Sequence, residues 1–228
     1  MLTLYTAIGT LKPAHNKDKK NYAAVINYGQ EYGLSEHEFV LWSCLAFQIL
    51  NIHELADTYI SKHQTNKCPE GMPLSHYLNR LLIRGLIAKG DGRTGMDAVY
   101  QLIRNLHLTP VDNSFHIRLC SGMRLFLSGQ ISLHDFSELM KSPSKTPMEE
   151  HILTQISKCS LTTIELITCL HYGIQITDEQ DILKRIHLDS QLKRSSPVTD
   201  ELLEPSQYPI IQAIGDLYLK KQICFCSY

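Results

Sequence analysis

The chain has 228 residues, a mass of 26.0 kDa and a formal net charge of -1, with 43% hydrophobic and 20% charged residues. This composition excludes wholesale disorder, collagen and a continuous coiled coil, and the length allows one large domain or two small ones. Because the whole chain is not basic, nucleic-acid binding would require a local basic patch.

The N-terminal residues, the apolar runs and the cysteines predict the cellular location. The first residues, MLTLYTAIGTLK, lack the basic segment of a secretory signal, and the longest apolar run, residues 39–47, is too short to span a membrane. These features predict a cytoplasmic protein with free thiols and no membrane partner. Of the seven cysteines, Cys224 and Cys226 form a C-x-C pair, which is an alternative redox or metal site.

Residues 1–33 are expected to form an N-terminal arm with a short helix. The segment 12–20 contains four lysines, one aspartate and one proline, which is typical of a loop. Residues 21–30 could then form the short helix.

Two helix starts follow, each marked by a cap. Ser35 and Glu38 fit the capping-box pattern, in which the two side chains satisfy each other's backbone N–H groups. Asn51 and Glu54 repeat this spacing ahead of a second, short helix.

A third helix is predicted over residues 74–84, where leucines recur on one face before the helix stop at Gly85. Residues 86–89 favour a short strand, and residues 90–95 a glycine-rich turn. The next segment leaves two alternatives: residues 98–103 form the second strand of a wing, or a helix is inserted there.

This order resembles the winged-helix domain of bacterial transcription regulators of the MarR and PadR families. The residues that carry the resemblance are 51–59, 74–84 and the Gly85-Leu86-Ile87 exit. It implies a DNA-binding domain over residues 34–106 whose third helix enters the major groove.

Side chains on that helix and the following loop could contact DNA. Asn can read adenine and Arg can read guanine, whereas Ser and His can contact phosphate. Residues 71–104 hold five Lys or Arg and two Asp or Glu, and this local excess favours a DNA face. The predicted DNA-contacting residues are Ser75, His76, Asn79, Arg80, Arg84, Lys89 and Arg93.

The second half is predicted to repeat the first. Residues 107–145 are expected to be a helical connector, with helices at 114–127 and 132–140 that could form a dimer surface. Residues 146–228 then form a second winged-helix-like domain, interrupted by an insertion near 177–204. Its helices are expected at 149–159, 160–171 and 205–219, followed by a strand at 220–225. Its third helix is nearly neutral and carries Asp216, so this domain is expected to pack, dimerise or bind a protein, with DNA reading as the alternative.

The remaining motifs have simpler interpretations. Gly90-x-Gly92-x-x-Gly95 matches the dinucleotide fingerprint literally, but no strand-helix-strand unit surrounds it, so a turn is favoured. The spacing of His63, Cys68 and His76 lacks the close ligand pairs of a zinc site. No catalytic signature is found, and we expect neither an enzyme nor a bound cofactor or metal.

The sequence therefore predicts a mainly α-helical fold with small β-wings, in which tandem winged helix-turn-helix units are joined by a helical connector. The predicted function is a sequence-specific, homodimeric regulator that binds double-stranded DNA. The alternatives are a protein-interaction scaffold and a plasmid-type replication initiator.

Overall fold

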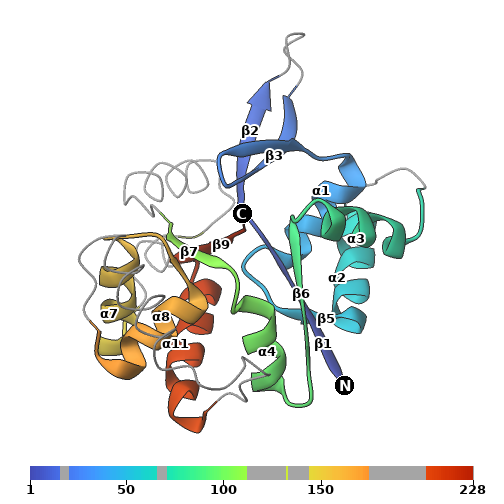
Figure 1. Ribbon diagram of the computed structural model, residues 1–228. Helices are drawn as coiled ribbons and strands as arrows, with labels where there is room; N and C mark the ends of the chain where they lie inside the picture. Colours follow the sequence, from blue (N-terminus) through green and yellow to red (C-terminus); the bar gives the residue numbers. More distant parts are fainter. Residues whose placement is uncertain (16–20, 66–70, 112–131, 133–143, 175–203, 228) are drawn as a thin grey trace.

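The structure is a computed structural model that describes residues 1–15, 21–65, 71–111, 132, 144–174 and 204–227. This part of the chain contains seven α-helices and three small antiparallel sheets (Figure 1). It is a mixed α/β fold. The expectation of a mainly α-helical protein built from tandem winged helices is therefore wrong.

The N-terminal strand is the centre of the first sheet. β1 (Leu2–Ala7) lies between β5 (Leu50–Asn51) and β6 (Ile87–Gly92). Its register with β6 pairs Leu2 with Gly92 and Ala7 with Ile87. The partner of β6 is thus the start of the chain, and not the second strand of a wing.

Three helices complete this N-terminal unit: α1 (Glu36–Leu45), α2 (Ile52–Thr65) and α3 (Leu74–Ile83). The predicted capping box of Ser35 and Glu38 is confirmed, and the Asn51 side chain accepts from the backbone N–H of Glu54. The helices pack through a cluster that includes the fully buried Leu41 and Leu81.

Residues 1–33 are not an arm with a short helix. β2 (Thr10–His15), β3 (Asn21–Asn27) and β4 (Gln30–Gly33) form a second sheet, with β3 in the middle. Ala24 and Val25 of β3 are fully buried, and this small apolar stretch outweighs the polar composition around it. In Figure 1 this sheet projects from the top of the molecule.

The segment predicted as a possible second wing strand is a helix. α4 (Gly95–Ile103) begins with a capping box in which Thr94 and Asp97 bond to each other's backbone N–H groups. Gly90 and Gly92 of β6 lie against the α4 backbone, so close that a Cβ on either would overlap it. The literal G-x-G-x-x-G match therefore reflects strand-helix packing.

Apart from the β2–β4 sheet, the described elements of the C-terminal unit follow the order of the N-terminal unit. β7 (His107–Pro110) lies between β8 (Leu161–Thr162) and β9 (Ile223–Cys226). The helices are α7 (Pro147–Ile156), α8 (Thr163–Tyr172) and α11 (Tyr208–Leu219), the last preceded by a 3-10 turn at Pro205–Gln207. The expected connector helices at 114–127 and 132–140 and the insertion near 177–204 lie outside the described residues, apart from single positions.

Matching hydrogen bonds close the third helix of each unit. The backbone N–H of Leu86 donates to the Leu81 carbonyl, and that of Gln222 donates to the Leu217 carbonyl, both at 2.9 Å. A second apolar cluster spans α4 and the C-terminal unit and includes Leu4 and Ile8 from the start of the chain. No described helix is both long enough and apolar enough to cross a bilayer.

Candidate functional site

Helix α3 carries most of the predicted DNA-contacting residues. Its buried side holds Tyr77, Leu78 and Leu81, which leaves the other face to solvent. The exposed residues of the predicted set on this helix are Ser75, His76, Asn79 and Arg80.

Glu38 of α1 binds both arginines at the end of α3. Its carboxylate lies 3.2 Å from Arg80 Nε and 3.3 Å from Arg84 Nη1. Arg84 also donates to the Gly33 carbonyl at 2.7 Å, so its guanidinium is held within the fold and does not face outward as predicted. Burial would raise the pKa of Glu38, but hydrogen bonds from Ser35 and the two guanidinium charges lower it, so the carboxylate stays charged.

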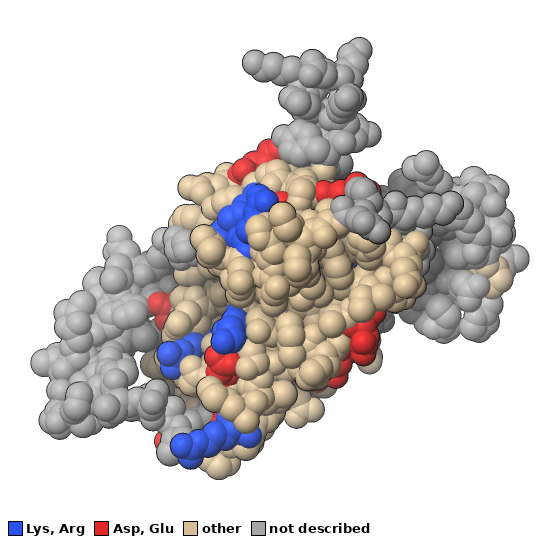
Figure 2. All heavy atoms as spheres, turned by 90° about the vertical axis from the view of Figure 1, so that its right-hand side faces the viewer, with Lys and Arg blue, Asp and Glu red and all other residues tan. Residues whose placement is uncertain are grey.

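The predicted basic residues on and after β6 are only partly available. Lys89 Nζ forms an ion pair with Asp91 at 3.0 Å, whereas Arg93 is exposed in the following turn. Over residues 34–106 the sequence holds seven Lys or Arg and seven Asp or Glu, so this unit has no net charge. Figure 2 shows a largely uncharged face on which basic and acidic groups are interspersed. The local basic excess predicted from residues 71–104 is therefore balanced by acidic groups on α1 and α2.

A hollow of about 380 Å³ opens beside this face, between the start of α1, the end of α2 and the residues that lead into α3. Its size is at the lower end of the range for ligand sites, enough for one or two side chains. The described residues that line it are His37, Tyr59, Ile60, His63, Gln64, Gly71 and Met72. None of these described lining residues is Asp, Glu, Lys or Arg.

Stacked rings form the wall of the hollow. His37 lies between Tyr77 and His63, with centroid distances of 4.9 Å and 5.2 Å and nearly parallel planes. His37 Nδ1 is 3.3 Å from the Tyr59 hydroxyl, and the Met72 backbone N–H donates to the Tyr77 hydroxyl at 3.0 Å. These contacts fix the rings, so the hollow is preorganised.

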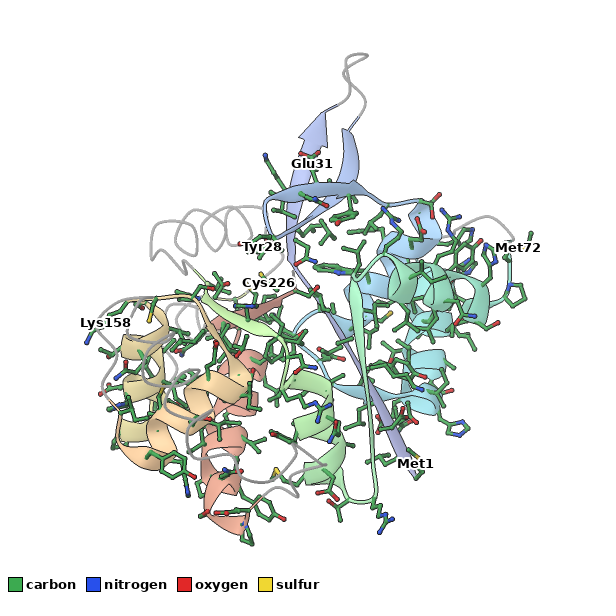
Figure 3. All side chains as sticks on the ribbon, viewed as in Figure 1. Met1, Tyr28, Glu31, Met72, Lys158 and Cys226 are labelled. Atoms are coloured by element: carbon green, nitrogen blue, oxygen red, sulfur yellow. The ribbon has the colours of Figure 1, made fainter. Side chains whose placement is uncertain are left out.

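Two apolar side chains stand at its rim. Ile60 is 53% exposed and Met72 62% exposed. Met72 is labelled at the outer edge of the molecule in Figure 3, ahead of α3. Exposed apolar groups of this size around a hollow are typical of binding surfaces.

This hollow was not among the sites predicted from the sequence, although the spacing of Tyr59 and His63 contains a signal. Residues four apart lie on one helix face, so the two rings had to be neighbours on α2. No sequence rule places His37 of α1 against them.

The described residues do not provide a metal site. Among the described residues, no three His, Cys, Asp or Glu side chains are grouped to hold an ion. Cys68 of the weak His63, Cys68 and His76 pattern lies outside the described residues.

Comparisons with known protein families, with characterised proteins and with solved structures found no match for this chain.

Proposed function

We propose that the chain is a non-enzymatic protein-binding protein, and that the hollow between α1, α2 and α3 receives an apolar side chain from a segment of a partner protein. The observation that carries this proposal is a ring-lined hollow whose described lining residues carry no Asp, Glu, Lys or Arg, with exposed Ile60 and Met72 at its rim. We place this activity in the cytoplasm, as part of the proposal, because four of the five described cysteines are buried free thiols.

The chemistry of the lining favours a protein segment as the occupant. The centres of protein interfaces are enriched in aromatic residues and Met and are depleted of charged residues. Rigid rings lose little conformational entropy when they are covered, and their imidazole and hydroxyl groups can bond to a backbone. A single anchor residue in such a hollow can supply much of the binding free energy.

The test is a selection, from a displayed library of random peptides, of those that bind the full chain. Selected peptides are expected to share an apolar or aromatic anchor, and Ile60→Asp and Met72→Asp should each weaken binding at least tenfold, about 1.4 kcal/mol. Leu219→Asp is the matched control, because Leu219 on α11 is also 53% exposed but lies outside the hollow.

Two results would overturn the proposal. One is a selection that yields no peptide sensitive to the rim variants. The other is equal loss of binding in the Leu219→Asp control, which would mean that the peptides recognise apolar surface in general.

DNA binding by α3 is a second candidate, favoured by one observation. Helix α3 contains no acidic residue over Leu74–Ile83, and its exposed face presents Ser75, His76 and Asn79. Arg80 at its end and Arg93 in the nearby turn could then contact phosphate. Since two half-sites are read by two copies, this candidate also requires a homodimer.

The two candidates predict opposite variant patterns. Fluorescence anisotropy with genomic duplex fragments at about 50 and 200 mM salt measures the contribution of phosphate contacts. A DNA reader should lose about 1–3 kcal/mol with Asn79→Ala and nothing with Met72→Asp. A protein binder should show no fragment selection at either salt concentration.

A further inference from the structure

Two exposed carboxylates lie next to residues of the ring-lined hollow. Glu36 is in the first turn of α1, directly before His37, whose ring is part of the wall. Asp57 lies on α2 three residues before Ile60, and residues at this spacing are neighbours on one face of a helix. The surroundings of the hollow therefore carry negative charge, although its described lining residues carry none.

No described cation neutralises these two carboxylates. None of the ion pairs found among the described residues includes Glu36 or Asp57. Lys62 of α2 donates to the Ser43 carbonyl at 2.9 Å instead. An exposed carboxylate without a partner attracts cations that come within a Debye length, about 10 Å at 0.1 M salt.

The arginines at the end of α3 leave this charge in place. Arg80 and Arg84 both bind the buried Glu38, so their charges are balanced there. Together α1 and α2 contain four Asp or Glu and one Lys or Arg. The two helices that form the hollow are thus acidic, even though the whole N-terminal unit has no net charge.

We propose that the segment received by the hollow is basic, with Lys or Arg beside its apolar anchor. The anchor fills the hollow, and the flanking cations lie near Glu36 and Asp57. This inference rests on the proposed function, because it names the chemistry of the segment that the hollow binds.

The exposed apolar rim also suits flanking Lys or Arg residues. Their long aliphatic stems can cover Ile60 and Met72, which are 53% and 62% exposed, while the charged ends stay in water. An acidic segment is repelled by Glu36 and Asp57. The same two carboxylates therefore attract one class of partner and discriminate against another.

The test uses synthetic fluorescent peptides titrated with the full chain. Each peptide has one apolar anchor, either Leu, Met, Phe or Trp, in a Gly-Ser background, and the residues that flank the anchor are all Lys, all Gln or all Glu. Lys-flanked peptides should bind about tenfold more tightly than Glu-flanked peptides at about 50 mM salt, with Gln-flanked peptides between them. This preference should shrink at about 300 mM salt, because salt screens exposed charges.

A double variant tests the two carboxylates directly. Glu36→Gln with Asp57→Asn should weaken the binding of Lys-flanked peptides at least about threefold and leave that of Gln-flanked peptides unchanged. The matched control is Glu150→Gln with Asp216→Asn, which removes the same charge from α7 and α11 of the C-terminal unit. Equal weakening in the control would mean that the net charge of the chain attracts the peptides, which would overturn the inference.

The Gln-flanked peptides separate this inference from the proposed function. If they bind and Met72→Asp abolishes their binding, but Lys and Glu flanks give equal affinities, the hollow binds a segment without selecting its charge. The inference is then wrong, and the proposed function stands. If no peptide of any charge binds in a way that Met72→Asp weakens, both are wrong.

Discussion

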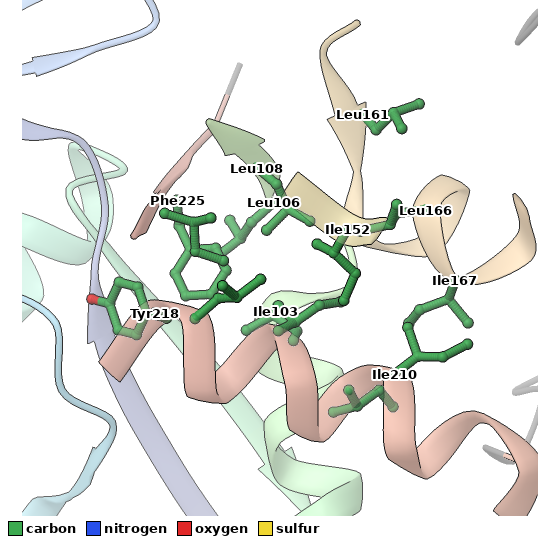
Figure 4. Packing of buried hydrophobic residues seen from close by; sticks show 14 of the residues in the cluster. Ile103, Leu106, Leu108, Ile152, Leu161, Leu166, Ile167, Ile210, Tyr218 and Phe225 are labelled. Carbon is green, nitrogen blue, oxygen red and sulfur yellow. The ribbon is translucent and has the colours of Figure 1, made fainter. Parts of the chain in front are cut away.

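The Tyr218 hydroxyl accepts a hydrogen bond from Thr6 Oγ1 at 2.8 Å, although the two residues are 212 positions apart in the sequence. It also accepts from the Phe47 backbone N–H at 3.0 Å and lies 3.2 Å from the Leu45 carbonyl. Figure 4 shows the ring packed with the buried cluster while its oxygen points away, toward the N-terminal unit. Burial raises the pKa of Tyr218 to about 12, so the phenol keeps its proton and joins the two units as both donor and acceptor.

Tyr218→Phe should destabilise the protein by about 1–3 kcal/mol, because the Phe47 N–H loses its acceptor and the buried Thr6 hydroxyl keeps only its bond to the Gln48 carbonyl. Urea unfolding measures this change. Tyr172→Phe is the control, since Tyr172 is 71% exposed, and it should change stability by less than about 0.5 kcal/mol. Equal effects of the two variants would contradict the role of the Tyr218 hydroxyl.

The capping glutamate of α7 predicts a second effect on stability. Glu149 is 1% exposed and lies 2.7 Å from Lys220 Nζ, at the end of α11. Lys220→Met should cost about 1–3 kcal/mol, because it leaves a buried carboxylate without its cation. Lys158→Met, at an exposed position after α7, should be near neutral in the same thermal or urea unfolding. A stable Lys220→Met protein would mean that other groups already satisfy Glu149.

The two buried glutamates also predict acid sensitivity. Burial alone would raise the pKa of Glu38 and of Glu149, but hydrogen bonds and neighbouring cations lower both below the ordinary value of 4.5. A carboxyl whose pKa is lower in the folded state stabilises the fold at pH values above its unfolded-state pKa of 4.5. This stabilisation is lost as the pH falls from 4.5 through the folded-state pKa. Unfolding free energies measured from pH 7 to pH 3 should therefore fall below pH 4.5, and less steeply in the Glu38→Gln, Glu149→Gln double variant. The exposed Glu150→Gln should keep the wild-type slope.

Gly92 of β6 and Gly95 of α4 give a matched stability test of the strand-helix contact. An added Cβ at Gly92 would overlap the Ala98 backbone, whereas one at Gly95 would meet no atom within 4 Å. Gly92→Ala should destabilise the protein by about 1–3 kcal/mol. Gly95→Ala, in the first turn of α4, should be neutral or stabilising by up to about 1 kcal/mol. Differential scanning calorimetry measures both changes in stability, and equal changes in the two variants would contradict the close contact between Gly92 and α4.

The helices could be predicted because their signals are local. A capping box needs only two side chains three residues apart, and the predicted box at Ser35 marks a real helix start. The leucine spacing of α3 likewise depends on one helix face. The same reasoning located Gly85, whose φ of 65° suits glycine, but not Lys221, which has a φ of 58° at the equivalent position.

The sheets could not be predicted because their partners are remote. A short strand shows its identity only when its partner is known, and β1 pairs with a strand more than 80 residues later. The charge environment of residues 71–104 likewise depends on residues outside that segment. Glu38, which binds Arg80 and Arg84, lies outside that window and reaches them only through the packing of α1 on α3.

The central position of β1 also constrains the order of folding. During synthesis this strand leaves the ribosome before both of its neighbours, and β6 is complete only at Gly92. Until then β1 can pair only with the two-residue strand β5, through Leu4 and Tyr5, and its other edge stays open to other chains. Because its contacts are so distant in sequence, closure of the sheet should be a slow step that follows helix formation. A nascent chain arrested before Gly92 would thus contain formed helices and a first strand that is still exposed to proteases.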